Sequence, residues 1–202
     1  MKIFAVGMNY AAHRKELHPA MVATEEPVIF TKPDSALLKP GRPFFVPDHL
    51  GRIDYEAEVV VRICRLGKTI SERFAHRYYD AATVGIDFTA RDLQREAAVR
   101  GLPWTVCKGF DGAAAIGEWR PAVAGQQFRF RLDRNGQTVQ QGCTADMTHS
   151  IDRLVSYISQ FFTLKTGDLI YTGTPAGIGP VQIGDRLEAW LDGDKVLDLR
   201  CR

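Results

Sequence analysis

The stretch from Ile53 to Ile63 constrains the fold of this chain more than any other part of the sequence. Every second side chain in it is apolar, through Ile53, Tyr55, Ala57, Val59, Val61 and Ile63. An apolar period of two is typical of a β-strand with one face packed on a core. The opposite face then carries Glu56 and Glu58, with Cα atoms about 7 Å apart. The sequence therefore predicts a core strand that presents two neighbouring carboxylates.

Short strands and polar turns make up most of the remaining pattern. Apolar runs at 28–30, 36–38 and 44–46 are separated by prolines at 27, 33, 40, 43 and 47, which break helices and keep strands short. Further strands are predicted at 3–6, 83–88, 128–132 and 169–171. Asn135-Gly136 and Asp192-Gly193 predict hairpin turns. The expected fold class is therefore α+β, rich in mostly antiparallel β-structure.

Four segments carry helix signals. They are residues 10–17, 71–82 with Ser71 as N-cap, 90–100 with Gly101 as the stop, and 151–162. In the last segment the apolar residues recur at the spacing of an amphipathic helix. We expect short helices on the flanks of the β-structure.

Composition excludes several classes of protein. Of the 202 residues, 45% are hydrophobic and 25% are charged, and this length favours one domain over residues 1–202. No apolar run approaches the roughly 18 residues of a membrane span, and no leader precedes the first strand. The 26 basic and 24 acidic side chains nearly balance, which gives no footprint for nucleic acid. We expect a cytoplasmic protein with no membrane or nucleic-acid partner and with reduced cysteines.

Three acidic residues form a candidate metal site. Glu56 and Glu58 share a strand face, and Asp87 falls inside an apolar strand, where a charge is costly to bury unless it is paired or bound to metal. Together they would offer only oxygen ligands, which favour Mg²⁺, Mn²⁺ or Ca²⁺ over zinc. The alternatives are a solvated strand face for the two glutamates and an N-terminal helix cap for Asp87.

A candidate general base lies near the N-terminus. His13 and Glu16 are three residues apart, so on a helix the carboxylate meets the imidazole, orients it and raises its basicity. Such a pair suits a base that acts on water. The alternative is an ordinary surface pair on a charged helix.

Other polar residues accompany these two groups. Arg91 and Gln94 share a helix face just beyond Asp87. Lys108 stands among apolar residues, where it can stabilise a carboxylate or an enolate oxygen, or extend its ammonium to solvent. The glycine-rich residues 172–179 include Thr174, whose hydroxyl could help to hold an anion.

The combination and order of these motifs closely resemble the fumarylacetoacetate hydrolase family, above all its small single-domain branch of acylpyruvases and oxaloacetate decarboxylases. The motifs are Gly-x-Asn-Tyr-x-x-His-x-x-Glu from Gly7, Asp-Tyr-Glu-x-Glu from Asp54, Gly-x-Asp-x-x-x-Arg-Asp-Leu-Gln from Gly85, Lys-x-Phe-Asp from Lys108, and Gly-Asp-x-Ile-x-Thr-Gly-Thr-Pro-x-Gly-x-Gly from Gly167.

The resemblance implies a mixed β-roll with short flanking helices, assembled as a homodimer. It assigns Glu56, Glu58 and Asp87 as ligands of Mg²⁺ or Mn²⁺, and His13 with Glu16 as a catalytic dyad on a segment that orders as a lid. The residues that match the surroundings of the substrate's carboxylate and oxo groups are Arg91, Gln94, Lys108 and Thr174. Met8 departs from the basic residue or leucine that small relatives often carry.

The residues and the resemblance together predict a metal-dependent enzyme that acts on a small 2-oxo acid. The expected reaction is hydrolysis of a C–C bond in a 3-acylpyruvate, in which His13 and Glu16 activate water and pyruvate enolate leaves onto the metal and Lys108. Decarboxylation of oxaloacetate uses the same enolate, as does isomerisation or hydration of an unsaturated 2-oxo dicarboxylic acid. A non-catalytic binding protein on the same scaffold is the alternative from another class.

Overall fold

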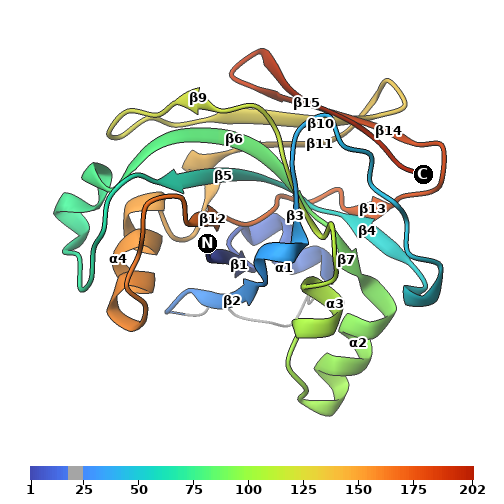
Figure 1. Ribbon diagram of the computed structural model, residues 1–202, viewed down its shortest axis with the longest axis horizontal. Helices are drawn as coiled ribbons and strands as arrows, with labels where there is room; N and C mark the ends of the chain where they lie inside the picture. Colours follow the sequence, from blue (N-terminus) through green and yellow to red (C-terminus); the bar gives the residue numbers. More distant parts are fainter. Residues whose placement is uncertain (18–24) are drawn as a thin grey trace.

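A computed structural model describes residues 1–17 and 25–202. A large curved sheet forms one layer and a four-stranded sheet covers one of its faces, with helices around the large sheet (Figure 1). The strands of the large sheet are β1 (Ile3–Gly7), β2 (Val28–Lys32), β3 (Leu37–Leu38), β5 (Ala57–Ile63), β6 (Tyr79–Asp87), β8 (Ala114–Ile116), β9 (Arg120–Pro121) and β12 (Leu169–Tyr171). The α+β, β-rich fold class predicted from the sequence is confirmed.

The large sheet is mixed. Its order is β2-β1-β12-β5-β6-β8-β3, with β9 also paired to β6. The pairs β1–β12 and β3–β8 are parallel, and the remaining pairs are antiparallel. Strand β5 therefore lies in the middle, bonded to β12 on one side and β6 on the other.

Strand β5 is buried on both faces. Val59 and Val61 enter the main core, whereas Val60 points the other way and joins a second apolar cluster with Ile3 and Tyr171. The predicted alternation is thus correct, but the face opposite the main core does not meet solvent. The solvated alternative for the two glutamates is wrong.

The predicted strand 53–63 bends at Glu56. Residues before the bend form β4 (Ile53–Tyr55), which pairs with β7 (Thr89–Ala90) and β13 (Gly179–Pro180) in a separate three-stranded sheet. The chain from β6 to β7 makes the same crossing just after Asp87. Both acidic residues therefore lie where the chain passes from one sheet to the other.

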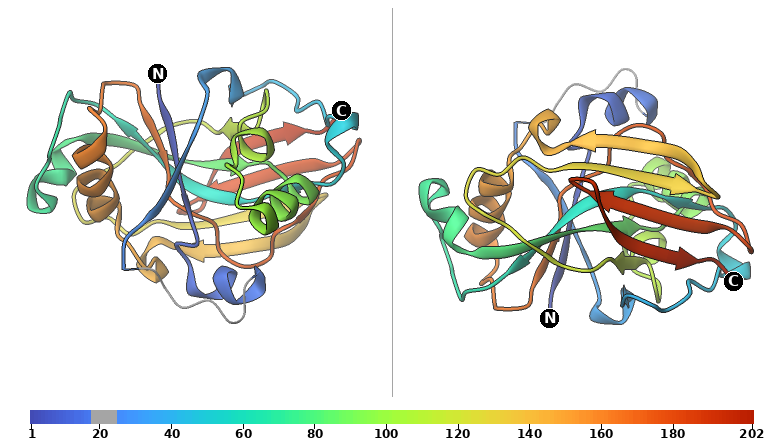
Figure 2. Two further views of the ribbon diagram at one scale, coloured as in Figure 1. Left: turned by 90° about the horizontal axis from the view of Figure 1, so that it is seen from below. Right: turned by 90° about the horizontal axis from the view of Figure 1, so that it is seen from above.

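The four-stranded sheet supplies the other side of the main core. Its order is β11 (Gln137–Cys143), β10 (Arg129–Arg134), β14 (Arg186–Leu191) and β15 (Asp194–Arg200), all antiparallel. Leu132 and Leu187 on its inner face belong to the same apolar cluster as Val59 and Val61. Both predicted hairpin turns join neighbouring strands of this sheet, and Figure 2 shows how it covers the large one.

The α-helices of the described residues are short, and three of them fall where the sequence predicts. They are α1 (Ala11–Leu17), α2 (Arg91–Arg100), α3 (Thr105–Lys108) and α4 (Ile151–Phe161). Ser150 caps α4 by accepting a bond from the backbone N–H of Arg153 at 3.1 Å. Gly101 ends α2 with a left-handed φ of 65°. None of these helices is long and apolar enough to cross a membrane.

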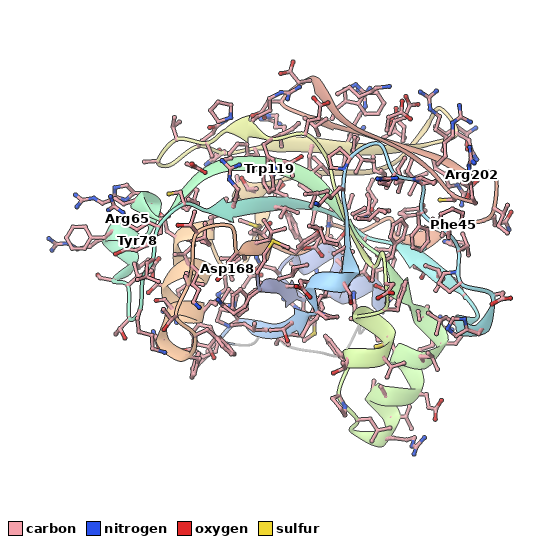
Figure 3. The ribbon with its side chains drawn as sticks, viewed as in Figure 1. Phe45, Arg65, Tyr78, Trp119, Asp168 and Arg202 are labelled. Atoms are coloured by element: carbon pink, nitrogen blue, oxygen red, sulfur yellow. The ribbon has the colours of Figure 1, made fainter. Side chains whose placement is uncertain are left out.

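The helix predicted for residues 71–82 is wrong. Only Glu72–Arg77 is helical, as a 3₁₀-helix, and β6 already begins at Tyr79. Tyr79 pairs with Ile63 of β5, so sheet pairing overrides the local helix signal there. At this end of the sheet Arg65 lies over the ring of Tyr78 at 5.8 Å (Figure 3).

The predicted cap role of Asp87 is also wrong. Helix α2 begins after Ala90, which makes no side-chain cap. Asp87 instead ends β6 and is 1% exposed. Its carboxylate does not cap the helix and takes part in the site described next.

Candidate active site

A cavity of about 340 Å³ lies between α1, α2 and the strand ends of the large sheet. Its wall contains every residue that the sequence singled out, namely His13, Glu16, Glu56, Glu58, Asp87, Arg91, Gln94, Lys108 and Thr174. These residues come from distant parts of the chain. Their meeting in one cavity makes it the candidate active site.

Three carboxylates converge at the inner end of the cavity. Glu56 lies at the bend between β4 and β5, and the backbone N–H of Asp87 donates to its carbonyl at 2.8 Å, which holds the two strands together. Glu58 follows on the same side of β5. One oxygen each of Glu56, Glu58 and Asp87 lies within 4.8 Å of the others, and all three residues are buried.

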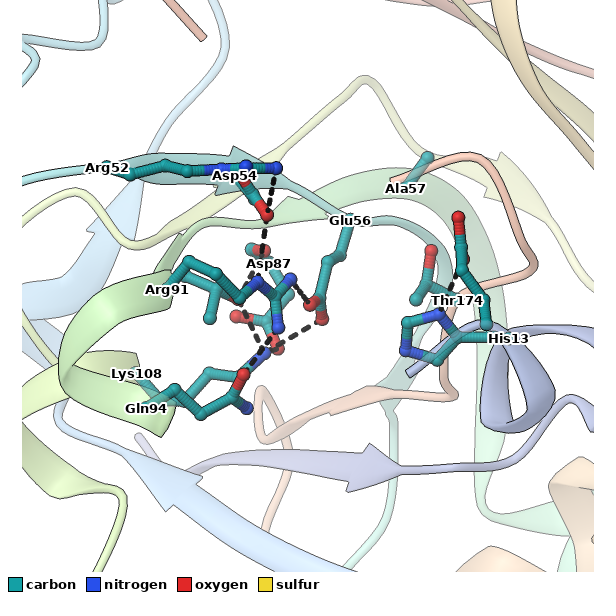
Figure 4. A network of polar contacts seen from close by, with 12 residues as sticks. His13, Arg52, Asp54, Glu56, Ala57, Asp87, Arg91, Gln94, Lys108 and Thr174 are labelled. Carbon is teal, nitrogen blue, oxygen red and sulfur yellow. Dashed lines mark hydrogen bonds and ion pairs between the residues drawn. The ribbon is translucent and has the colours of Figure 1, made fainter. Parts of the chain in front are cut away.

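Buried cations surround two of the carboxylates (Figure 4). The ammonium of Lys108 donates to Glu56 Oε2 at 2.8 Å, to Asp87 Oδ2 at 2.9 Å and to Thr89 Oγ1 at 2.6 Å. Arg91 Nη2 donates to Glu56 Oε1 at 2.5 Å. Burial opposes ionisation of Glu56, but Lys108 and Arg91 outweigh it and hold the pKa of Glu56 well below its usual range.

Lys108 does not extend to solvent. The residue is 3% exposed, and all three of its ammonium protons have acceptors in the protein. Its neighbouring carboxylates raise its pKa against the effect of burial. In this arrangement Lys108 holds Glu56 and Asp87 together.

Glu58 has no cationic partner among the residues that the structure describes. Its Oε2 accepts a bond from the backbone N–H of Gly173 at 2.6 Å. Burial, together with the nearby Asp87 and Glu56, raises the pKa of Glu58 well above its ordinary value. Three converging buried oxygens, one of them without a counter-charge, fit a hard divalent cation such as Mg²⁺ or Mn²⁺.

Gly173 is required at this contact. Its φ is 103°, and a Cβ built on it would lie 2.7 Å from the Cβ of Asn9. A side chain at this position would therefore push the backbone N–H away from Glu58. The glycine signal in the sequence thus has a direct role at the carboxylate cluster.

His13 lies in the cavity wall at 5% exposure. Its Nδ1 is 3.3 Å from Glu16 Oε2, so with Nδ1–H donating, Nε2 is left as the basic nitrogen. Burial lowers the pKa of His13, although Glu56 and Glu16 act in the opposite direction. The ring is therefore neutral at pH 7 and can accept a proton.

Glu16 has a second partner. Both of its carboxylate oxygens lie 3.3 Å from the backbone nitrogen of Gly177, in the glycine-rich loop. The same carboxylate thus orients His13 and fastens α1 to that loop. The predicted ordering of this segment as a lid remains a prediction, and residues 18–24, which follow the helix, lie outside the described residues.

Each guanidinium nitrogen of Arg91 donates a hydrogen bond within the protein. Its Nε donates to Asp54 Oδ2 at 2.8 Å, its Nη2 to Glu56, and its Nη1 to Gln94. Arg52 completes the group by donating to Asp54 Oδ1 at 2.7 Å. In this structure Arg91 and Gln94 position the glutamate rather than extend freely into the cavity.

Two residues at the site were missed by the sequence analysis. Lys32, 3% exposed, places its ammonium 2.6 Å from Asp87 Oδ1. Gln140 accepts from the backbone N–H of Ala57 at 2.9 Å and donates to Thr174 Oγ1 at 2.8 Å. Lys32 ends an apolar strand, which is a weak signal, and nothing near Gln140 in the sequence marks it.

Comparisons with known proteins show which family the chain resembles over its whole length. The family model described as fumarylacetoacetate (FAA) hydrolase C-terminal matches residues 2–201. The chain is 39% identical to the oxaloacetate tautomerase YcgM of Escherichia coli, over 95% of this chain and 89% of that protein. It is 41% identical to the mitochondrial oxaloacetate tautomerase FAHD1 of Arabidopsis thaliana, over 95% of this chain and 86% of the other.

A solved structure is similar over the whole chain. Fumarylpyruvate hydrolase from Pseudomonas aeruginosa, in complex with Mn²⁺ and pyruvate, has a TM-score of 0.90 and 33% identity. The match covers 100% of this chain and 89% of that one.

Proposed function

Because this chain belongs to the fumarylacetoacetate hydrolase C-terminal family, we propose that it is a metal-dependent enzyme that interconverts the keto and enol forms of a small 2-oxo acid of the oxaloacetate type. The observation that carries the proposal is the placement of His13. A neutral imidazole, oriented by Glu16, shares one cavity with a cluster of buried carboxylates. Named relatives about 40% identical, the oxaloacetate tautomerases of E. coli and A. thaliana, support the choice of reaction.

Glu56, Glu58 and Asp87 would hold the metal. When bound, Mg²⁺ or Mn²⁺ supplies a Lewis acid that favours negative charge on the 2-oxo oxygen of the substrate. Lys32, Lys108 and Arg91 hold the carboxylates of Glu56 and Asp87 in place. The hydroxyl of Thr174 accepts a bond from Gln140 at 2.8 Å, and a substrate carboxylate in the cavity would take its proton in place of the Pro175 carbonyl, which lies 3.4 Å away.

His13 transfers the proton. In the direction from keto to enol, Nε2 takes a proton from C3, and the electrons of that C–H bond form the C2–C3 double bond. The 2-oxo oxygen gains the charge and then the proton, which gives the enol and regenerates neutral His13. Glu16 stabilises the imidazolium between the two transfers.

The test uses oxaloacetate supplied as its enol. We expect the protein with Mg²⁺ to speed the loss of enol absorbance well beyond the buffer rate, and EDTA to abolish the effect. His13→Ala should lower the rate by about 10²- to 10⁴-fold, the usual contribution of a general acid–base. His49→Ala is the matched control, because His49 is exposed and pairs with Asp48 away from the cavity. A wild-type rate equal to that of buffer would refute the proposal.

Hydrolysis of a 3-acylpyruvate is the second candidate. The His13–Glu16 pair favours it, because it could equally deprotonate water, and so does the similarity to a fumarylpyruvate hydrolase. The water oxygen would bond to C4, the C3–C4 electron pair would go to pyruvate enolate, and His13 would return the proton to C3. Metal-dependent loss of acetylpyruvate absorbance tests this reaction. Decarboxylation of oxaloacetate would release CO₂ without a water step and is assayed in parallel.

A further inference from the structure

Most of the cationic side chains in the cavity wall are already neutralised by the protein. The wall holds Arg14, Arg91, Arg95 and Lys108. Lys108 uses all three of its ammonium protons on Glu56, Asp87 and Thr89. Arg91 donates one bond from each guanidinium nitrogen, to Asp54, Glu56 and Gln94. The positive charges of both side chains are therefore paired with buried carboxylates of the protein.

The two remaining arginines differ. Arg95 lies 3.7 Å from Asp92 on the surface of α2, with its side chain 66% exposed. Arg14 is half-buried, and among the described residues its guanidinium has no hydrogen bond or ion pair. A half-buried guanidinium that has no partner among the described residues and lines a cavity is suited to bind an anion.

The position of Arg14 defines which anion would fit. It follows His13 directly on α1 and lines the same cavity, whereas the carboxylate cluster lies at the inner end. Met8, Phe30 and Trp104 contribute uncharged wall, with the two rings packed edge to face at 5.4 Å. The cavity thus offers the carboxylate cluster, an uncharged wall and the cationic Arg14. A ligand with an anionic group at each end and a short carbon chain between them would match these three surfaces.

We propose that Arg14 binds the distal carboxylate of the substrate and so selects 2-oxo diacids over 2-oxo acids with a neutral end. The inference rests on the proposed function, because it assumes that the 2-oxo end lies at the carboxylate cluster. Arg14 acts by contact with the substrate, and His13 beside it acts at C3. The two residues would then contact adjacent parts of one ligand.

The test compares two ligands that share the inner end and differ at the outer end. Oxaloacetate has a distal carboxylate, and oxalate, used as a competitive inhibitor, lacks the two carbons that carry that group. In the Mg²⁺-supplied protein we expect Arg14→Gln to lower kcat/KM for oxaloacetate by about 10- to 100-fold, the range for a lost charge-assisted bond. The inhibition constant of oxalate should stay within about 2-fold. Lys15→Gln is the control, because Lys15 is the exposed neighbour on the same helix and does not line the cavity.

Other outcomes would overturn the proposal. An equal loss for both ligands would mean that Arg14 supports the fold of the site, and no loss for either would mean that it binds nothing there. If the wild type does not turn over oxaloacetate, titration calorimetry with oxalate and with non-enolisable 3,3-difluorooxaloacetate replaces the kinetics. Selective weakening of the second ligand in Arg14→Gln would then support Arg14 even though the proposed reaction had failed, and equal or no weakening would reject it.

Discussion

At the scale of the residue, His13 shows how burial and charge compete. Removing the ring from water disfavours its protonated form, and the neighbouring Glu56 and Glu16 favour it. Burial wins, so the pKa falls below the ordinary 6.5. A histidine in this state is a base across the neutral range.

The pH profile should carry this signature. Activity that needs neutral His13 is constant at higher pH and is lost as the pH falls through its lowered pKa. We expect kcat/KM, measured at saturating Mg²⁺, to lose activity with a midpoint below pH 6.5. In the His13→Ala variant the remaining activity should not show this loss at low pH. A midpoint above 6.5 would show that the base is another group or that His13 is more hydrated than the structure indicates.

The cysteines give a second prediction at this scale. Burial raises the pKa of Cys201 to about 12, and the residue is 1% exposed. Cys107 is also buried, whereas Cys64 and Cys143 are partly exposed. Iodoacetamide at pH 8 should therefore modify Cys64 and Cys143 in the native protein and spare Cys107 and Cys201 until it is denatured. Peptide mass spectrometry measures this, and early labelling of Cys201 would contradict it.

At the scale of the element, β11 connects the four-stranded sheet to the site through one side chain. Gln140 is 2% exposed, and its amide bonds Ala57 N–H, Thr174 Oγ1 and the Pro175 carbonyl. Ala57 stands between two of the predicted metal ligands. Gln140 therefore fixes the backbone from which both glutamates project.

Replacing Gln140 tests this connection. Gln140→Ala leaves the buried Ala57 N–H unpaired, and we expect Mg²⁺ affinity to fall by about 10- to 100-fold. Gln141→Ala is the matched control, since that neighbour is exposed. Calorimetric titration with Mg²⁺ measures both. Equal affinities in the two variants would show that the metal ligands do not depend on Gln140.

The elements also show what could be predicted from the sequence. The alternation around Glu56 and Glu58 correctly gave their shared face, because it is a local property of the strand. The bend at Glu56 and the burial of that face depend on β7, β12 and β13, which are remote in sequence. Lys32 and Gln140 were missed for the same reason. The helix predicted at 71–82 was wrong because Tyr79 pairs with Ile63 in the sheet.

At the scale of the whole molecule, the buried charges of the site are unevenly paired. The carboxylates of Asp54, Glu56 and Asp87 each contact a buried cation, from Lys32, Arg91 or Lys108. Glu58 has no cationic partner among the described residues, so a negative charge on it is costly in a low-dielectric interior. A bound divalent cation would relieve that cost.

Metal should therefore stabilise the native protein. At a free Mg²⁺ concentration 100-fold above Kd, the gain is about 2.7 kcal/mol, which corresponds to a rise in Tm of roughly 5–10 °C for a chain of this size. Differential scanning calorimetry with Mg²⁺ and with EDTA measures the shift. Glu58→Gln removes one predicted ligand and should reduce the shift strongly. A shift of the same size in that variant would place the metal elsewhere.

The double contact of Glu16 has a consequence for the timing of catalysis. Because the carboxylate of Glu16 contacts both His13 and Gly177, the contact that fastens α1 to the glycine-rich loop also fixes where the oriented base lies in the cavity. The observed turnover rate is then the intrinsic rate multiplied by the fraction of molecules in which this contact is closed. Any ligand that reaches both α1 and the strand ends would increase that fraction, so the substrate itself would switch on the base that acts upon it.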